Sequence, residues 1–205
     1  MLNVAVAAIG IVVTAPLCLV IATLVKLTSR GPVFYSQPRV GIDRRRGRPT
    51  PEQLSRRKHD QGGRLFRIYK FRTMVQNSSG PQVWASDEDP RITPVGRVLR
   101  RYRLDEIPQL WNVLKGDMNI VGPRPEQPEI FVDLRDQVTA YQKRQRVLPG
   151  ITGLAQVSHH YDQCIDDVRT KVRYDLEYIQ RRSLSQDLRI MAKTIPVMVG
   201  KKGAI

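Results

Sequence analysis

Residues 2–25 form an almost wholly apolar segment without a single charged side chain, and this segment constrains the fold more than any other feature. A helix of this length reaches across a hydrocarbon core of about 30 Å. A secretory signal peptide is the alternative, but no positive residue precedes the segment, and the run is longer than the roughly 7–15 apolar residues of a signal-peptide core. We therefore expect residues 1–30 to form a membrane helix.

Lys26 and Arg30 follow the apolar segment directly, so the positive-inside rule keeps residues 31–205 in the cytoplasm. The sequence thus predicts one cytoplasmic domain attached to the inner membrane. Pro16 lies in the middle of the segment, where it removes a backbone hydrogen bond and kinks or breaks a helix. Two geometries remain open: a kinked span, or a helix that enters, bends and returns to the same face.

The formal net charge of +15 calls for an anionic partner, such as nucleic acid, an anionic membrane surface or phosphorylated substrates. Between Arg39 and Arg72, 12 Lys or Arg stand against 3 Asp or Glu. The middle of this stretch, residues 43–63, is a basic loop that is either solvated or in contact with lipid headgroups. With only two cysteines, neither a disulfide framework nor a cysteine-based zinc site is available.

Short aromatic and β-branched runs flank the basic loop, at residues 33–35 and 65–71, and predict two strands. Helices dominate from Thr93 onward, where a good N-cap is followed by Pro94 at the first helical position. Apolar residues recur at helical spacing in three stretches: Val95, Val98, Leu99 and Tyr102; Ile107, Leu110, Trp111 and Leu114; Val168, Val172, Leu176 and Ile179. These apolar faces form either a core or a membrane-interface contact, so the fold class predicted is α+β and mainly helical.

Two adjacent carboxylates, Asp105 and Glu106, stand at the expected start of a helix that Gly116 would end. Asp105 is expected to cap this helix, and an ordinary N-cap pair is one interpretation. The other is chemical, because the free N–H groups of a helix start attract phosphate. A carboxylate in that position can hold Mg²⁺ or attack phosphorus.

A second motif, Gly122-Pro-Arg-Pro-Glu126, fixes the backbone on both sides of Arg124. The guanidinium of an arginine binds phosphate oxygens as a planar fork, and a rigid turn lowers the entropy lost in aiming it. A rigid surface turn is the alternative interpretation. Neither motif alone decides the function.

Taken together, six motifs resemble those of the bacterial sugar transferases, the monotopic phosphoglycosyl transferases, in family order and over nearly the whole chain. They are Gly31-Pro-Val-Phe-Tyr, Tyr69-Lys-Phe-Arg-Thr-Met74, Asp89-Pro-Arg-Ile-Thr-Pro-Val-Gly96, Leu104-Asp-Glu-Ile-Pro-Gln-Leu-Trp-Asn-Val-Leu-Lys-Gly-Asp-Met118, Val121-Gly-Pro-Arg-Pro-Glu126 and Pro149-Gly-Ile-Thr-Gly-Leu-Ala-Gln156.

The resemblance implies a re-entrant N-terminal membrane helix, a small β-hairpin, amphipathic interfacial helices and a catalytic domain over residues 31–205. It further implies Mg²⁺, a UDP-sugar donor, a polyprenol (undecaprenyl) phosphate acceptor, contact with membrane lipids and a ping-pong reaction that releases UMP. By the same resemblance, this reaction is expected to be the first membrane step of glycoconjugate or exopolysaccharide synthesis. Association into a homo-oligomer is compatible with the sequence, and no nucleic-acid partner is expected.

By the same resemblance, Asp105 is the nucleophile and Glu106 its partner, and both are candidates for holding the metal. Arg124, with Pro123 and Pro125, matches the motif that binds donor phosphate. The other candidates for substrate binding are Arg72, Arg91, Arg100 and Asp175.

The sequence departs from the family pattern at two places. Ala15 stands where the family often has Ser before the helix-breaking proline, so Thr14 must supply any hydroxyl that bonds the backbone. The loop over residues 43–63 is also longer than the family's usual connection. Two rival functions are a membrane-tethered nucleic-acid binder and an inactive scaffold of glycan assembly. No recognised nucleic-acid motif supports the first, and a scaffold needs neither Asp105 nor Arg124.

Overall fold

The structure is a computed structural model, and it describes residues 2–44, 60–75, 89–159 and 164–199. Most of the predicted basic loop lies outside the described residues. The helices and strands are, in chain order, α1 (Leu2–Thr28), β1 (Phe34–Val40), β2 (Leu65–Phe71), α3 (Pro94–Arg101), the 3₁₀ turn η1 (Leu104–Glu106), α4 (Gln109–Leu114), β3 (Asn119–Val121), α5 (Pro128–Gln137), the 3₁₀ helix η2 (Tyr141–Arg146), β4 (Gly150–Thr152), α6 (Leu154–Ser158), α7 (Ile165–Arg181) and α8 (Leu184–Val199).

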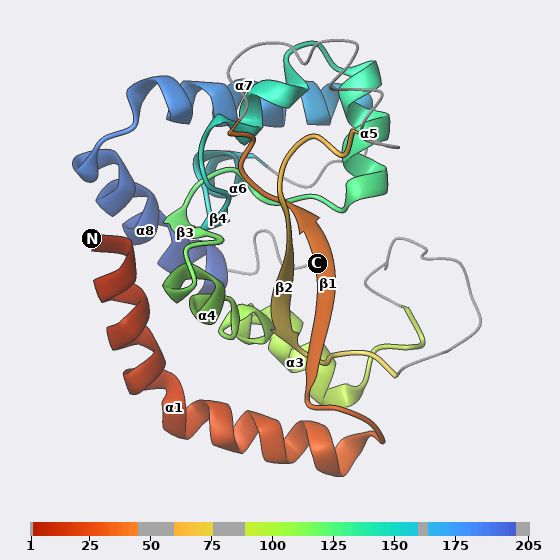
Figure 1. Cartoon of the computed structure of the whole chain (residues 1–205). Helices are drawn as coiled ribbons and strands as arrows, with labels where there is room; N and C mark the ends of the chain where they lie inside the picture. Colours follow the sequence, from red (N-terminus) through yellow and green to blue (C-terminus); the bar gives the residue numbers. More distant parts are fainter. Residues whose placement is uncertain (1, 45–59, 76–88, 160–163, 200–205) are drawn as a thin grey trace.

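The apolar segment forms a single long helix, α1, which Figure 1 shows bending between its two halves. Pro16 lies inside this helix, and a proline without an N–H is a common cause of such a bend. The hydroxyl of Thr14 donates to the carbonyl of Gly10 at 2.7 Å, as the sequence led us to expect of this residue. By length and composition α1 is able to cross a membrane, and little of it is buried in the protein.

Both ends of α1 contact the rest of the chain. Near the N-terminus, the side-chain oxygen of Asn3 accepts a hydrogen bond from the backbone N–H of Ile120 in β3, at 3.1 Å. Near the C-terminus, Arg72 donates to the backbone oxygen of Ser29 at 2.8 Å. Helix α1 therefore wraps around one side of the domain and does not lead away from it (Figure 1).

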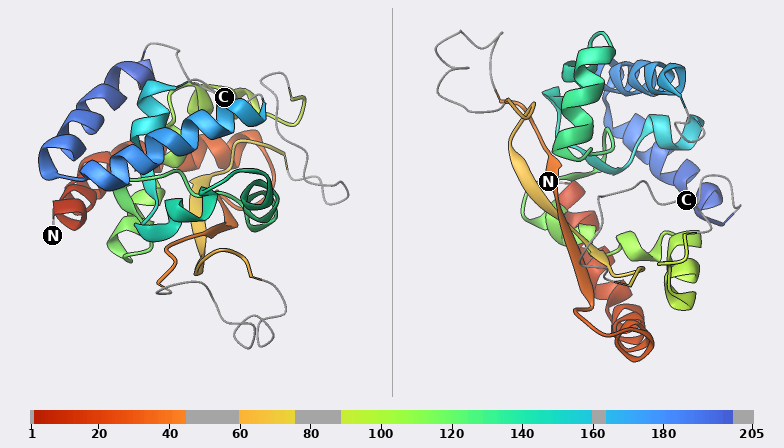
Figure 2. Two further views of the ribbon diagram at one scale, coloured as in Figure 1. Left: turned by 90° about the horizontal axis from the view of Figure 1, so that it is seen from above. Right: turned by 90° about the vertical axis from the view of Figure 1, so that its right-hand side faces the viewer.

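Strands β1 and β2 pair antiparallel, with Phe34 opposite Phe71 and Val40 opposite Leu65. This confirms the two strands predicted on either side of the basic loop. Figure 2 shows this pair along one side of the molecule, with α7 and α8 on the other. The inward residues of β2, Phe66 and Ile68, pack in the main hydrophobic cluster. The strand pair thus connects the region of α1 and α3 with the region of α5 (Figure 1).

The helix that was expected to begin at the two carboxylates, Asp105 and Glu106 (the dyad), begins later in the chain than predicted. Thr93 caps α3 as expected, because its hydroxyl accepts from the N–H of Gly96 at 2.9 Å. Asp105 and Glu106, however, lie in the separate 3₁₀ turn η1, and α4 begins only at Gln109. The expectation that Asp105 caps a helix is therefore wrong. The carboxylate makes no cap hydrogen bond, and the helix-dipole argument for this residue no longer applies.

A short parallel pair, β3 with β4, was not predicted from the sequence. Three-residue strands are too short for a recognisable periodicity. The strands approach closely, because a Cβ atom on Gly150 would lie 2.1 Å from the backbone nitrogen of Gly122. Between β3 and β4 the chain forms two separate helical elements. Helix α5 ends at Gln137, and η2 begins after Ala140, whose φ is 66°.

Three hydrophobic clusters hold the elements together. The largest joins β2, α4, β3, α7 and α8 with the N-terminal half of α1, and a second joins β1, α5, η2 and α7. The third packs Ile21 and Val25 of α1 against Phe71 and Leu99. The fold is α+β and mainly helical, as predicted, with two small sheets in place of one.

Candidate active site

The two carboxylates lie in a tight turn beneath strand β2. Arg103 precedes the turn with a left-handed backbone, at φ 53°. A non-glycine residue in this region is uncommon, and such conformations gather at functional sites. The turn places both Asp105 and Glu106 in the interior, where each is less than a tenth exposed.

Glu106 is surrounded by cations from three different segments. Its Oε1 accepts from Lys70 Nζ of β2 at 2.7 Å and from Arg124 Nη2 at 2.8 Å, while Oε2 lies 3.7 Å from Arg103 Nη1. Burial alone would raise the pKa of Glu106, but Arg124 and Lys70 hold it well below its usual range. This carboxylate is therefore ionised at neutral pH, and it fixes the two cations in space.

Asp105 has a different environment, although it is the next residue in the chain. Among the described residues, Asp105 pairs only with Lys70, whose Nζ lies 3.8 Å from Oδ2. Burial raises the pKa of Asp105, and the charge of Lys70 offsets this only in part. An ionised Asp105 is thus poorly solvated and weakly paired, which leaves its oxygens available to a ligand.

Arg124 reaches the dyad from the loop after β3, as its proline-flanked motif suggested. Backbone hydrogen bonds hold both prolines: Pro123 O accepts from Gly150 N at 2.9 Å, and Pro125 O accepts from the Arg39 guanidinium at 3.2 Å. The loop is therefore fixed on one side by β4 and on the other by β1. The structure brings Arg124 and Glu106 together, two of the residues predicted for the site.

Asp175 lies behind this loop and does not reach the dyad. The carboxylate accepts from the fully buried Arg144 at 2.6 Å, and Arg144 in turn donates to the backbone oxygen of Arg124 at 3.0 Å. Burial raises the pKa of Asp175, and the Arg144 guanidinium opposes that shift. Asp175 is placed to support Arg124 through Arg144, and a direct contact between Asp175 and substrate remains a prediction.

The three remaining arginines predicted for substrate binding have different partners in the structure. Arg100 has Nη1 at 3.8 Å from the sulfur of Met74, and its charge contributes a small lowering to the pKa of Asp105, which burial otherwise raises. Arg91 Nη2 forms a salt bridge with Asp89 Oδ2 at 2.6 Å. Arg72 is buried and bonds the C-terminal end of α1. For these three residues substrate binding stays a prediction.

Sequence reasoning missed Lys70, Arg103 and Arg144 as parts of this site. Lys70 lies in β2 between Tyr69 and Phe71, but Arg67 is a second cation in the same strand, so no clear signal in the sequence pointed to Lys70. Arg103 stands two residues before Asp105, and this proximity was the available signal. For Arg144 no signal existed, because its partner lies 31 residues further along the chain.

The chain is similar in sequence to a known protein family and to several characterised proteins. A family model described as "Bacterial sugar transferase" matches residues 1–201. The UDP-N-acetylgalactosamine-undecaprenyl-phosphate N-acetylgalactosaminephosphotransferase of Aeromonas hydrophila is 46% identical over 201 residues, which cover 97% of this chain and 43% of that protein. The UDP-glucose:undecaprenyl-phosphate glucose-1-phosphate transferase of Caulobacter vibrioides is 37% identical, with 97% of this chain and 68% of that protein covered.

The undecaprenyl-phosphate glucose phosphotransferase of Komagataeibacter xylinus is 38% identical over 188 residues, which cover 88% of this chain and 32% of that protein. The chain thus spans less than half the length of the relatives from Aeromonas and Komagataeibacter, and about two thirds of the one from Caulobacter.

Proposed function

The chain belongs to the bacterial sugar transferase family, and from this premise we propose that it transfers a sugar phosphate from a UDP-sugar to a polyprenyl phosphate, with release of UMP. The names of relatives that are 46% and 37% identical describe reactions of this class. The observation that carries the proposal is the dyad itself: a buried, weakly paired Asp105 beside a Glu106 that fixes Lys70 and Arg124.

In the first step, a carboxylate oxygen of Asp105 attacks the phosphorus that carries the sugar. The bond from that phosphorus to the bridging oxygen breaks, and UMP leaves with the electron pair. The product on the enzyme is an acyl phosphate between Asp105 and the sugar. Lys70 and Arg124, held by Glu106, are positioned to neutralise phosphate oxygens, without which an anion does not approach a diphosphate.

In the second step, an oxygen of the polyprenyl phosphate attacks the same phosphorus. The bond to Asp105 breaks, so the carboxylate is regenerated and a polyprenyl diphosphate sugar leaves. Glu106 is unsuited to give a proton in either step, because Arg124 and Lys70 hold its pKa low in spite of burial. Its role in this proposal is to orient the cations for both phosphates.

The dyad fits Mg²⁺. The described residues contain no group of three or more His, Cys, Asp or Glu side chains that would form a protein cage for a metal. Mg²⁺ is usually held by one or two carboxylates together with substrate phosphates and water, and Asp105 with Glu106 would supply the protein part. When bound, the ion neutralises phosphate oxygens.

We place the protein at the cytoplasmic face of the inner membrane, with α1 as a re-entrant helix. Asn3 near its start bonds β3, and Ser29 after its end bonds Arg72, so both ends are attached to the same domain. The bend around Pro16 supports an entry and a return through the same leaflet.

The test is intact-mass analysis after incubation with a UDP-sugar and Mg²⁺, in the absence of polyprenyl phosphate. We expect the wild type to gain the mass of one phosphosugar and to release one UMP. Asp105→Asn should gain nothing and lose turnover by several orders of magnitude. Because the substitution removes a desolvated charge, it should not lower the melting temperature.

Asp166→Asn is the matched control, since Asp166 is exposed on α7 and pairs only with Arg169 in the described part of the chain. It should behave as the wild type. A phosphosugar adduct on Asp105→Asn, or full turnover in that variant, would show that Asp105 is not the nucleophile. If the wild type releases no UMP from any UDP-sugar, the proposed activity is wrong.

A further inference from the structure

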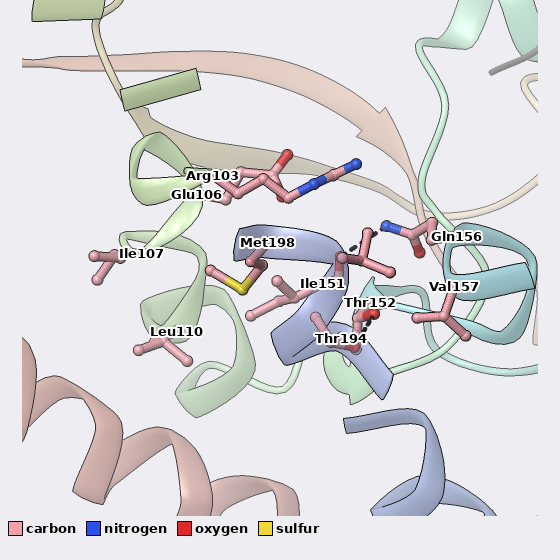
Figure 3. A pocket seen from close by; sticks show the side chains of 11 residues that line it. Arg103, Glu106, Ile107, Leu110, Ile151, Thr152, Gln156, Val157, Thr194 and Met198 are labelled. Atoms are coloured by element: carbon pink, nitrogen blue, oxygen red, sulfur yellow. Dashed lines mark hydrogen bonds and ion pairs between the residues drawn. The ribbon is translucent and has the colours of Figure 1, made fainter. Parts of the chain in front are cut away.

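A cavity of about 170 Å³ opens directly beside the dyad (Figure 3). Its walls come from α4, from β4 with α6, and from the last turns of α8. At one end lie the side chains of Arg103 and Glu106, as Figure 3 shows. The rest of the lining is mostly apolar: Ile107, Leu110, Ile151, Val157, Val197 and Met198.

The hydroxyls in this cavity are satisfied within the protein. Thr152 and Thr194 share a hydrogen bond of 2.8 Å, and the Thr194 hydroxyl also bonds the carbonyl of Ile190 at 2.8 Å. Gln156 also lines the cavity, where its Nε2 donates to the carbonyl of Ile151 at 3.0 Å and its Oε1 has no partner among the described residues. A nucleobase, which needs several polar partners for its amide edge, would find this one acceptor beside the apolar part. A hydrocarbon group requires none.

We propose that this cavity binds the isoprenoid unit next to the phosphate of the acceptor, an inference that rests on the proposed function. The charge and polarity of the cavity match this occupant. Arg103 lines its charged end beside Glu106, and Lys70 and Arg124 bond the same carboxylate from outside the lining. A phosphate held by these three cations would direct its attached chain into the apolar part.

The size of the cavity agrees with this occupant. An engineered apolar cavity of about 150 Å³ stays dry and binds benzene. A five-carbon isoprenoid unit is slightly smaller than that ring, so one unit fits and a whole polyprenyl chain does not. The following units must leave the protein. Helix α8, which supplies one wall, has Leu184, Leu188 and Ile195 exposed on its outer side, and they offer an apolar path to lipid.

Met198→Gln tests the inference, because Met198 lines the cavity and belongs to none of the hydrophobic clusters of the described residues. The matched control is Ala192→Gln, because Ala192 is exposed on the same helix and does not line the cavity. In detergent micelles, the KM for undecaprenyl phosphate should rise about tenfold in Met198→Gln, while the KM for the UDP-sugar stays within about twofold of the wild type. Met198→Trp, which fills the cavity, should act in the same direction. The control should change neither value.

Binding of undecaprenyl phosphate alone is measured in parallel, as the rise in melting temperature without donor. The rise should be present in the wild type and in Ala192→Gln, and reduced in both Met198 variants. A higher donor KM with an unchanged acceptor KM would mean that the cavity takes the nucleotide, and unchanged values in both Met198 variants would mean that it takes no substrate. Either result overturns the inference. If the wild type shows no transfer, the proposed function fails, but the melting experiment still decides whether the cavity binds the acceptor.

Discussion

Two neighbouring carboxylates in one turn have opposite pKa shifts. Burial raises the pKa of Asp105, whereas Arg124 and Lys70 overcome the effect of burial at Glu106 and lower its pKa. Two neighbouring titratable groups whose pKa values shift in opposite directions usually have different roles in a reaction. Here the weakly paired Asp105 is suited to attack, and the strongly paired Glu106 is suited to hold cations in place.

The first prediction at this scale concerns Arg124. Its Nη2 bonds Glu106 at 2.8 Å, and the prolines on either side keep the backbone fixed. Arg124→Lys preserves the charge but loses the planar fork that holds a carboxylate and a phosphate together. We expect a folded protein whose kcat falls by about 10²-fold or more. Arg181→Lys, on the exposed part of α7, is the control, and an unchanged kcat in Arg124→Lys would contradict the assigned role.

A second residue-scale prediction concerns Glu126, which follows the proline-flanked loop. Burial would raise its pKa, but Lys171 at 2.7 Å and Arg144 lower it from 4.5 to about 2. A depressed pKa means that the ionised form stabilises the fold above pH 4.5, and that this contribution disappears as the pH falls towards 2.

Glu126→Gln should therefore lower the free energy of unfolding at pH 7 by on the order of 3–5 kcal/mol, because it removes the negative charge that faces Lys171 and Arg144 in the interior. The difference from the wild type should shrink steadily between pH 4.5 and about 2. Urea unfolding at several pH values measures it. A difference that stays constant over this range would show that Glu126 is not ionised in the folded protein.

Helices and strands were predicted correctly where the residues that determine them are close together in the sequence. Thr93 with Pro94 marked the start of α3, and the aromatic runs marked β1 and β2. The same reasoning failed at Asp105, because propensity does not show that a turn with a left-handed Arg103 interrupts the helix. The sequence also did not predict contacts between residues far apart in the chain, such as the pairing of β3 with β4 and the bond from Arg144 to Asp175.

The amphipathic helices divide their apolar faces between the core and the surface, and contact of the exposed part with a membrane stays a prediction. On α3, Leu99 is buried, while Val98 and Tyr102 are exposed although they lie on the same predicted face. On α4, Leu110 packs against the core and Trp111 is 56% exposed. Each face thus contributes partly to the core and partly to the surface, a division that periodicity alone does not give.

The re-entrant geometry proposed for α1 is tested by cysteine labelling. If both ends lie on the cytoplasmic side, a cysteine at Asn3 should react with a membrane-impermeant thiol reagent only from the cytoplasm, like a cysteine at Thr28. The native cysteines, Cys18 and Cys164, are first replaced by serine, since both are free. Pro16→Leu should favour a straight helix of about 40 Å, which is long enough to span. Labelling of the Asn3 position from the periplasm in the otherwise unchanged protein would exclude the re-entrant geometry.

For the whole molecule, with its net charge of +15, part of the positive charge lies next to the apolar helix. Arg97 and Arg101 of α3 are exposed beside Val98 and Tyr102, and α3 contacts α1. If α1 enters a membrane, anionic headgroups would meet these two arginines. The basic stretch over residues 43–63 lies largely outside the described residues.

We therefore expect that a double substitution of Arg97 and Arg101 by Gln reduces the preference for anionic over neutral vesicles at 0.1 M salt. Raising the salt to 1 M should abolish that preference in the wild type, because the screening length falls from about 10 Å to about 3 Å. Attachment itself should persist, since it depends on α1. The control is Arg169→Gln with Arg181→Gln on α7. Vesicle flotation measures both quantities, and an unchanged preference in the α3 variant would contradict the prediction.

The hydrogen bond between Asn3 and Ile120 also has a consequence for the order of folding. The two residues are 117 positions apart, and at a synthesis rate of about 5–20 residues per second the partner of the first helical turn appears roughly 6–23 s after it. Throughout that interval the N-terminal half of α1 lacks the β3 surface that it contacts in the finished domain. We expect lipid to cover this half first, so that attachment to the bilayer precedes completion of the domain during biosynthesis.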